Sequence, residues 1–256
     1  MARTARRLDA GLAGRVLTRT DFRVPALATL DLAGWTYRGT DTVGKHLLGR
    51  FNRDDRTVTL HSHLGMDGVW QYLPPGRRWA RPAHQCRAVL EAGRVGAAAF
   101  AMKTFELLDP AGEQELRERL GPDLLDAGAG LSPAADALGG TDRPVAAALL
   151  DQTVVAGLGT VLVSEVCFLR GVHPLTPSDD VDATRLLAVA RKVITASVVT
   201  GTRVTTGNTR AGQQYWVYGR DGRACRRCGT PVQRVHVGPA GQERGIFFCP
   251  SCQPLG

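Results

Sequence analysis

The sequence lacks the features that would place it in a membrane or leave it disordered. None of its apolar runs reaches the roughly 18–20 residues that a membrane-spanning helix needs, and no apolar block follows the basic N-terminus as in an export signal. Charged residues are only 22% of the 256, and the mean hydropathy is −0.11. With 43% hydrophobic residues, the chain can bury a substantial core. These observations predict a soluble cytoplasmic protein with no membrane partner.

Lysine and aromatic residues are scarce. Only Lys45, Lys103 and Lys192 could supply a neutral side-chain amine, because arginine stays protonated. Aromatic residues are 6% of the chain, which disfavours a zinc-ribbon protein that stacks RNA bases on an aromatic platform. The other basic residues are arginines, and the formal net charge of +8 predicts an anionic partner, nucleic acid first.

The charge is unevenly distributed. Residues 1–121 carry 19 basic and 13 acidic side chains, residues 122–202 carry 5 and 9, and residues 203–256 carry 8 and 2. A proteome rich in arginine would explain why the basic residues are arginines and not lysines. It explains the clustering of the charges less well. Two basic segments that flank an acidic one suit a DNA clamp made from both ends of the chain.

Four of the six cysteines form two C-x2-C pairs with 20 residues between them, near the C-terminus. They are Cys225, Cys228, Cys249 and Cys252. This spacing predicts one tetrahedral zinc ion in a closed, structural site. A tail of about 30 residues has too little apolar surface to fold alone, and zinc would supply the deficit. Two disulfides are the alternative, disfavoured without an export signal. Cys86 and Cys167 are expected to be buried thiols.

Hydrophobic periodicity divides the chain into a β-rich and a helical part. A helix is expected at 3–13, a sandwich or barrel-like β domain from 15 to about 108, and a linker near 110–133. Further helices are expected at 143–150, 161–169 and 182–199, and a hairpin at 234–237 and 245–248.

Two features of the second half could hold a phosphate. Gly157-Leu158-Gly159 lacks the third glycine of a dinucleotide-binding fingerprint and follows a helix, so it predicts a tight turn between two helices. The free N–H groups of such a turn and the N-terminus of the next helix can hold a DNA phosphate. Arg244 starts the second hairpin strand and, as a cation at the hairpin tip, could reach another phosphate; a solvated surface arginine is the alternative.

Four segments, in order along nearly the whole chain, carry a resemblance. They are 44–48 with Lys45; 61–70 with Met66; 148–174 with Gly157, Gly159 and Glu165; and 216–253 with Arg244 five residues before Cys249. They resemble the lysine hairpin, the lesion-gap segment, the helix–two-turn–helix and the zinc finger of the formamidopyrimidine-DNA glycosylase and endonuclease VIII family.

The resemblance implies an α+β multidomain fold. An N-terminal helix and β-sandwich would occupy 1–121, a helix–two-turn–helix DNA-binding domain 122–206, and a four-cysteine zinc finger 216–256, with duplex DNA in a cleft. The implied activity is base excision repair by a bifunctional DNA glycosylase and abasic-site lyase, which flips an oxidised base out of damaged double-stranded DNA and cleaves by β,δ-elimination. Val69-Trp70 favours the endonuclease VIII branch and oxidised pyrimidines. A nucleoid-associated monomer is expected.

Catalytic roles come with the resemblance. Lys45 would assist β-elimination and hold a phosphate; an ordinary surface lysine is the alternative. Arg244 would grip the phosphate at the flipped nucleotide and take part in δ-elimination. Glu165 would lie at the edge of the active site, with capping or structural duty as the alternative.

DNA-binding roles come with it too. Met66 would fill the space that the flipped base leaves, with core packing as the alternative. Gly157 and Gly159 would form the phosphate-binding turn. Thr160 stands where the family usually has an asparagine that contacts a phosphate, and its hydroxyl can donate a hydrogen bond with a shorter reach.

The sequence departs from the family at its start. After the initiator methionine is removed, the family begins with proline, whose amine attacks the sugar, and glutamate, its acid partner. This chain opens Met1-Ala2-Arg3, as if the first helix were entered about six residues late. Two interpretations stay open. The start was placed too far downstream, at a codon where the family has valine, or the protein binds damaged DNA without catalysis.

Overall fold

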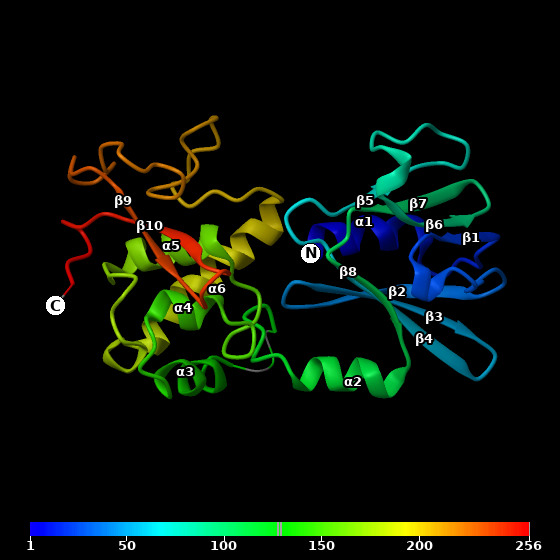
Figure 1. The fold of residues 1–256 in the computed structure, drawn as a ribbon, viewed down its shortest axis with the longest axis horizontal. Helices are drawn as coiled ribbons and strands as arrows, with labels where there is room; N and C mark the ends of the chain where they lie inside the picture. The colour runs from blue at the N-terminus through cyan, green and yellow to red at the C-terminus, as the bar shows by residue number, and fades with distance from the viewer. Residues whose placement is uncertain (127, 129, 256) are drawn as a thin grey trace. The chain divides into compact units, whose positions relative to one another are not determined.

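The computed structural model describes residues 1–126, 128 and 130–255. The chain divides into two compact units, Met1–Glu118 and Arg119–Gly256 (Figure 1). None of its described helices is long and apolar enough to cross a membrane.

The first unit is a sandwich of two antiparallel four-stranded sheets. One sheet has the order β2-β3-β4-β8 and the other the order β1-β6-β7-β5. The first comprises β2 (Thr36–Val43), β3 (His46–Arg53), β4 (Arg56–His63) and β8 (Thr104–Leu108). The second comprises β1 (Arg19–Phe22), β5 (Val69–Tyr72), β6 (Cys86–Ala92) and β7 (Val95–Phe100), and short 3-10 turns cover Pro25–Leu27 and Ala83–Gln85.

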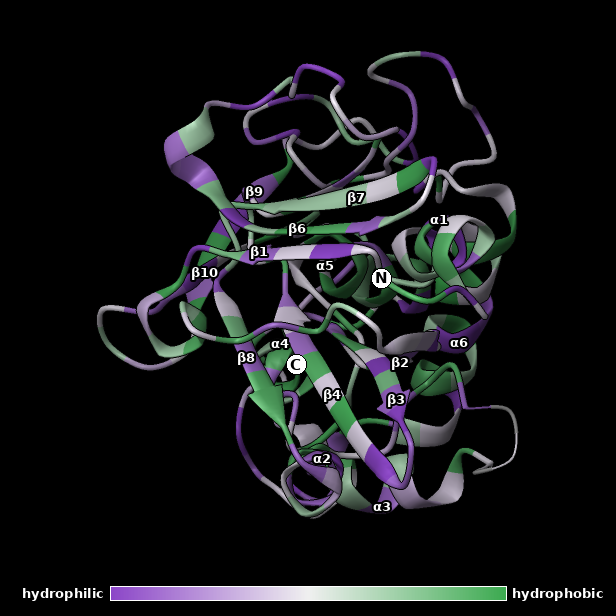
Figure 2. Cartoon of the chain, turned by 90° about the vertical axis from the view of Figure 1, so that its right-hand side faces the viewer, coloured by the Kyte–Doolittle hydropathy of each residue, from purple (hydrophilic) through white to green (hydrophobic). Residues whose placement is uncertain are grey.

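Side-chain alternation explains this packing. Strand β4 is banded in hydrophilic and hydrophobic colours along its length (Figure 2), as expected of a strand with one face toward a core. Phe51 and Leu60 from one sheet and Leu90 from the other share a buried cluster. Helix α1 (Ala2–Leu12) adds Leu8 and Leu12 to that cluster. The predicted N-terminal helix and β-sandwich are confirmed.

The linker predicted near 110–133 is wrong in its first part, because helix α2 spans Pro110–Glu118. Proline is compatible with the first helical turn, where its missing N–H has no partner to lose. The Asp109 carboxylate accepts a hydrogen bond from the Gly112 N–H at 2.7 Å, which caps the helix. Leu116 is its buried apolar anchor, and one such residue gives no periodic signal.

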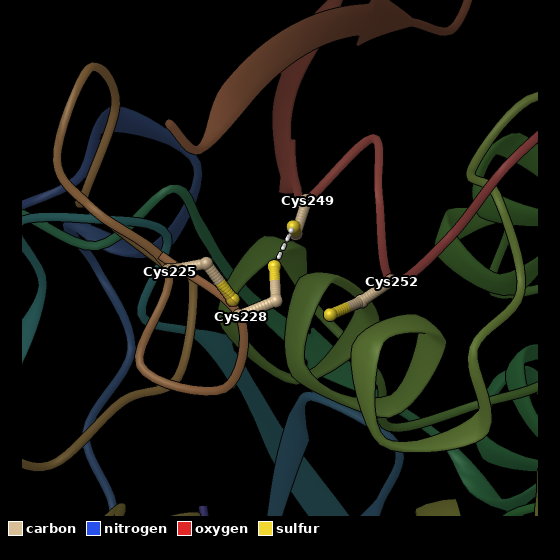
Figure 3. Close-up of side chains that lie close together, drawn as sticks. All are labelled: Cys225, Cys228, Cys249 and Cys252. Carbon is tan, nitrogen blue, oxygen red and sulfur yellow. Dashed lines mark hydrogen bonds between the residues drawn. The ribbon is translucent and has the colours of Figure 1, made fainter. Parts of the chain in front are cut away.

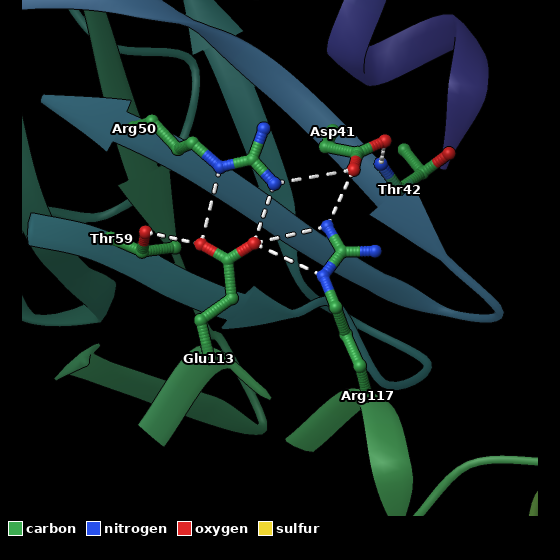
Figure 4. A network of polar contacts seen from close by, with 6 residues as sticks. All are labelled: Asp41, Thr42, Arg50, Thr59, Glu113 and Arg117. Carbon is green, nitrogen blue, oxygen red and sulfur yellow. Dashed lines mark hydrogen bonds and ion pairs between the residues drawn. The ribbon is translucent and has the colours of Figure 1, made fainter. Parts of the chain in front are cut away.

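Ionic contacts hold α2 on the sheet (Figure 4). Glu113 accepts hydrogen bonds from Arg50 Nε at 3.2 Å and from the Thr59 hydroxyl at 2.6 Å. Arg117 pairs with Glu113, one turn earlier, and with Asp41 on β2. Burial opposes ionisation of Glu113, but hydrogen bonds from Arg50, Thr59 and Arg117 outweigh it and lower its pKa to about 2.

The second unit is helical and ends in a hairpin. It contains α3 (Ser132–Gly139), α4 (Val145–Leu150), α5 (Thr160–Arg170), a 3-10 turn (Ser178–Asp180), α6 (Ala183–Thr200), β9 (Gln233–Val237) and β10 (Arg244–Phe248). One buried cluster joins α5 and α6 with Val237 and Ile246 of the hairpin. Gly171 ends α5 in the left-handed region with φ 68°, where glycine is favoured. The three helices and the hairpin predicted here are confirmed within a residue or two.

Candidate nucleic-acid interface and metal centre

The four C-terminal cysteines converge on one point (Figure 3). Their sulfur atoms all lie within 4.8 Å of one another, and Cys228 Sγ is 3.4 Å from Cys249 Sγ. Tetrahedral zinc with Zn–S bonds of about 2.3 Å would set its sulfurs about 3.8 Å apart. The four thiols therefore fit a metal ion with little movement. All six cysteines are free thiols, and Cys86 and Cys167 are buried as expected.

Aromatic and cation–π contacts join α5 to the first C-x2-C pair, Cys225 and Cys228, and to the segment before it. Phe168 on α5 stacks on Trp216 with ring centroids 5.6 Å apart. The guanidinium of Arg227, between the first two cysteines, lies 4.3 Å from the centroid of Phe168, a favourable cation–π contact.

Gln253 joins the second C-x2-C pair, Cys249 and Cys252, to the end of α5. Its side chain is fully buried. Its Oε1 accepts from the Cys249 N–H at 3.0 Å, and its Nε2 donates to the Val172 carbonyl at 2.7 Å. The four-cysteine cluster is thus fixed to the helical domain on two sides.

Glu165 is also fully buried on α5. It accepts hydrogen bonds from the backbone N–H groups of Trp216, Val217 and Tyr218 at 2.8–2.9 Å, and from the Thr205 hydroxyl. Both of its oxygens are engaged and none of its surface is exposed. The geometry favours the structural alternative for Glu165, which fastens the 205–218 segment to α5. Sequence reasoning could not find these partners because they lie 40–53 positions downstream.

The side chain of Gln152, for which the sequence predicts no role, holds the turn before α5. Gln152 donates to the Leu150 and Leu158 carbonyls at 2.8 and 3.2 Å and accepts from the Gly157 N–H at 3.1 Å. The expectation that the turn's N–H groups are free is therefore wrong for Gly157. With φ 106°, Gly157 adopts a conformation that other residues rarely take.

The N-terminus of α5 presents backbone donors. Gly159 is its N-cap and Thr160 its first residue. Among the described residues, no acceptor contacts the N–H groups of Gly159 and Thr160. Such groups at a helix N-terminus bind anions well, because the helix dipole adds to their partial charge.

Lys45 occupies the two-residue turn between β2 and β3, after Gly44. Glycine with a positive φ, here 56°, suits a tight hairpin turn. The side chain of Lys45 is half-buried on this hairpin. The turn places Lys45 at one end of the sheet.

Two other predicted residues lie on the surface. Met66 is 91% exposed in the loop between β4 and β5, so the alternative of core packing is wrong. Arg244 begins β10 opposite Val237, beside the loop that joins the two strands of the hairpin, and is exposed. Lys45 and Met66 belong to the first unit, and Thr160, Glu165 and Arg244 to the second.

A β-sandwich with a lysine hairpin, followed by α-helices and a four-cysteine hairpin, defines the class of helix–two-turn–helix DNA glycosylases. Residues 120–209 match the family described as Formamidopyrimidine-DNA glycosylase H2TH domain. A probable endonuclease 8 2 of Streptomyces coelicolor is 44% identical over 254 residues, covering 97% of this chain and 90% of that protein. The DNA-(apurinic or apyrimidinic site) lyase Nei2 of Mycolicibacterium smegmatis is 41% identical over 252 residues, covering 98% and 95%.

A solved structure agrees on the fold. It is Lactococcus lactis Fpg in complex with DNA that contains an abasic site, with a TM-score of 0.79, 24% identity, and coverage of 99% of this chain and 98% of that one. The chain belongs to the formamidopyrimidine-DNA glycosylase and endonuclease VIII family, on its endonuclease 8-like side.

Proposed function

We propose that this protein is a DNA glycosylase and abasic-site lyase of base excision repair that acts on damaged duplex DNA. The observation that carries the proposal is similarity at 41–44% identity, over nearly the whole chain, to proteins named endonuclease 8 and abasic-site lyase. The net charge of +8 supports a polyanionic partner.

The first unit supplies residues to the lesion in this proposal. The exposed Met66 enters the base stack, because an apolar wedge lowers the cost of extruding a nucleotide. Lys45 holds a phosphate and assists β-elimination. Residues 1–121 form this catalytic-type domain.

The second unit grips the backbone. Gly159 and Thr160 at the start of α5 contact one phosphate, within the domain 122–206. Arg244 on the finger 216–256 grips another at the flipped nucleotide and supports δ-elimination. The four cysteines hold one zinc ion, which supplies structural order to the finger when bound.

Two finer features belong to the proposal. Oxidised pyrimidines are the favoured substrates, supported by Val69-Trp70 and by the endonuclease 8 relatives. The protein acts as a monomer.

The start of the chain calls for a paired experiment, because the family's attacking amine is an N-terminal proline and this sequence opens Met1-Ala2. One protein is the 256-residue chain. The other, the extended chain, carries an initiator methionine and Pro-Glu-Gly-Asp-Thr-Val in place of Met1. Borohydride trapping on a duplex with one abasic site reports the covalent amine adduct, and gel shifts report binding.

We expect both proteins to bind in a salt-dependent manner and the extended chain to trap far more DNA, because an α-amino group with a pKa of about 7.7–8.0 supplies the nucleophile. If the extended chain binds without trapping or cleaving, the protein is the alternative, a non-catalytic damaged-DNA-binding protein. If neither protein binds at low ionic strength, the proposal fails.

A further inference from the structure

A cavity of about 220 Å³ lies on the outer face of the second sheet, β1-β6-β7-β5. The strand register sets Val89 of β6 between Asp21 of β1 and Ala98 of β7. Val89 and Ala98 belong to a buried cluster apart from the core between the two sheets, which contains their neighbours along each strand. The floor of the cavity is therefore apolar, and the small side chain of Ala98 leaves it hollow.

The chain between β5 and β6 covers part of this face (Figure 1). It begins with a tight turn at 74–77, whose first carbonyl accepts a hydrogen bond from the Arg77 N–H at 3.3 Å. Proline followed by Gly76, with φ 77°, is typical of a type II turn. Trp79 packs edge-on against Phe100, with ring centroids 5.4 Å apart. These contacts hold the covering loop in a defined position.

Arginines line the sides of the cavity. Cζ of Arg23 lies 5.0 Å from the centroid of the Trp79 ring, and its Nε and Nη2 donate to Asp21 at 3.1 and 2.7 Å. Arg19 Nη1 donates to Glu91 at 3.1 Å. The carboxylates orient the two guanidiniums and engage only some of the five N–H donors that each of them carries. The remaining donors can bind a ligand.

The covering loop carries charge of one sign. Residues 68–90 contain four arginines and no acidic residue. Arg77, Arg78 and Arg81 are exposed, and no acceptor contacts their side chains in the part of the chain that the structure describes. Arg77 also lines the cavity. This surface attracts an anionic partner.

The apolar floor indicates which kind of anion fits. A phosphodiester backbone binds cations on an open surface and gains nothing from an apolar hollow. A peptide with carboxylates on either side of an aliphatic residue uses both features, because guanidinium groups bind carboxylates well and a buried apolar anchor adds affinity. At roughly 30 Å³ for each water-sized group, the cavity has room for a side chain of four carbons such as leucine.

We propose that the cavity and its arginines form a docking site for an acidic peptide segment of a partner protein. The aliphatic side chain of the peptide enters the cavity beside Trp79, and the neighbouring carboxylates pair with Arg23 and Arg77. The site lies on the second sheet, whereas Lys45 lies on the first, and Met66 precedes the strand β5 that the covering loop follows. The inference goes beyond the proposed function and does not depend on it.

The first test uses a labelled heptapeptide with one leucine between two runs of three aspartates. It is titrated into the full 256-residue chain at low ionic strength and followed by fluorescence anisotropy. We expect saturable binding at micromolar concentrations, and about tenfold weaker binding of the same peptide with alanine in place of leucine, because less apolar surface is buried. Equal binding of the two peptides would overturn the role of the cavity. Absence of saturable binding would overturn the docking site.

The second test uses variants of the protein. Arg77→Glu reverses a lining charge on an exposed loop and should weaken binding of the leucine peptide about fivefold. Arg38→Glu, at an exposed arginine of β2 in the other sheet, is the matched control and should leave binding unchanged. Equal weakening by both variants would show that net charge alone attracts the peptide, and would overturn the site.

A third variant, Ala98→Leu, fills the hollow. It should bind the leucine and the alanine peptide with equal affinity, because neither side chain can then enter. A tenfold preference for leucine that persists in Ala98→Leu would show that the peptide binds elsewhere. The comparison of the two peptides on the wild type tests the cavity even if Ala98→Leu does not fold.

Competition with an undamaged duplex tests the other polyanion. We expect the duplex to leave the peptide bound, and Arg77→Glu to bind the duplex as well as Arg38→Glu does. Displacement of the peptide, together with a loss of duplex affinity in Arg77→Glu alone, would assign the cavity to DNA and overturn the proposal. A chain that binds the peptide and ignores every duplex would keep the docking site and remove the proposed function.

Discussion

The β-sandwich and the finger are stabilised by different kinds of interaction. The sandwich buries a large apolar cluster that runs through both sheets and α1. The finger's own cluster is small, and two of its buried members, Cys225 and Cys249, are metal-ligand candidates. Glu165 and Arg227 add polar attachments to α5. Where the apolar core is small, the position of a segment depends on charged groups and on the hydrogen bonds that they make. Removing one such partner therefore has a large effect on the stability of that segment.

Metal removal should separate the two regions most strongly. Structural zinc contributes roughly 10–16 kcal/mol of apparent binding free energy in finger peptides, so chelation or Cys249→Ser should expose the amides of 216–256 to rapid exchange. The strands of the sandwich should keep their protection. Cys86→Ala, a buried cysteine of the sandwich, is the control. Finger amides that stay protected after chelation would refute this account of the finger.

Glu165→Gln should have the next largest effect. One amide NH₂ would replace an oxygen that faces backbone N–H donors, leaving buried groups unsatisfied at a cost of about 3 kcal/mol. Hydrogen exchange should show the 205–218 segment opening more readily. Glu115→Gln should leave that segment unchanged, and equal exchange in both variants would contradict the role assigned to Glu165.

Glu113→Gln tests whether the sandwich has an ionic dependence of its own. We expect a loss of about 2 kcal/mol, smaller than for Glu165, because the partner Arg50 is 39% exposed. The folded pKa of Glu113, about 2, lies below its ordinary value of 4.5. Its contribution is therefore complete above about pH 4.5 and lost as the pH falls toward 2.

The measurement is urea unfolding of the full chain at pH 7, 4 and 3, followed by the methyl signals of Leu116 on α2. The wild type should lose stability around α2 between pH 4 and 3, and Glu113→Gln should lose less. Parallel losses in the two proteins would show that other carboxylates dominate.

Met66→Ala should have the smallest effect on stability, within about 0.5 kcal/mol, because the side chain is 91% exposed. In the extended chain it should lower the excision rate about tenfold, since the wedge that offsets unstacking is lost. Val199→Ala, also an exposed apolar residue at 73%, should change neither quantity. A stability loss above 1 kcal/mol would show that Met66 packs against the protein.

Local signals account for what the sequence predicted well. Helix α5 has an apolar face and a glycine at its end, and the paired C-x2-C motifs predict the finger hairpin. The sequence did not predict helix α2, because the helix is held by Arg50 and Asp41 rather than by an apolar stripe. Arg50 is 63 positions from its partner Glu113, and Asp41 is 76 positions from its partner Arg117. The sequence includes Gln152 in the segment 148–174 but does not predict its hydrogen bonds, because these depend on the path of the turn. The roles of Lys45 and Arg244 stay predictions.

The most direct test of the account is strand cleavage by the zinc-loaded extended chain on a duplex with a single abasic site. Lys45→Ala is compared with Lys192→Ala, which removes an exposed lysine on α6. We predict efficient cleavage by the parent and by Lys192→Ala, and at least a tenfold loss in Lys45→Ala. Cleavage at equal rates by both variants, or none by the parent, would contradict the assignment of the lysine hairpin to the lesion.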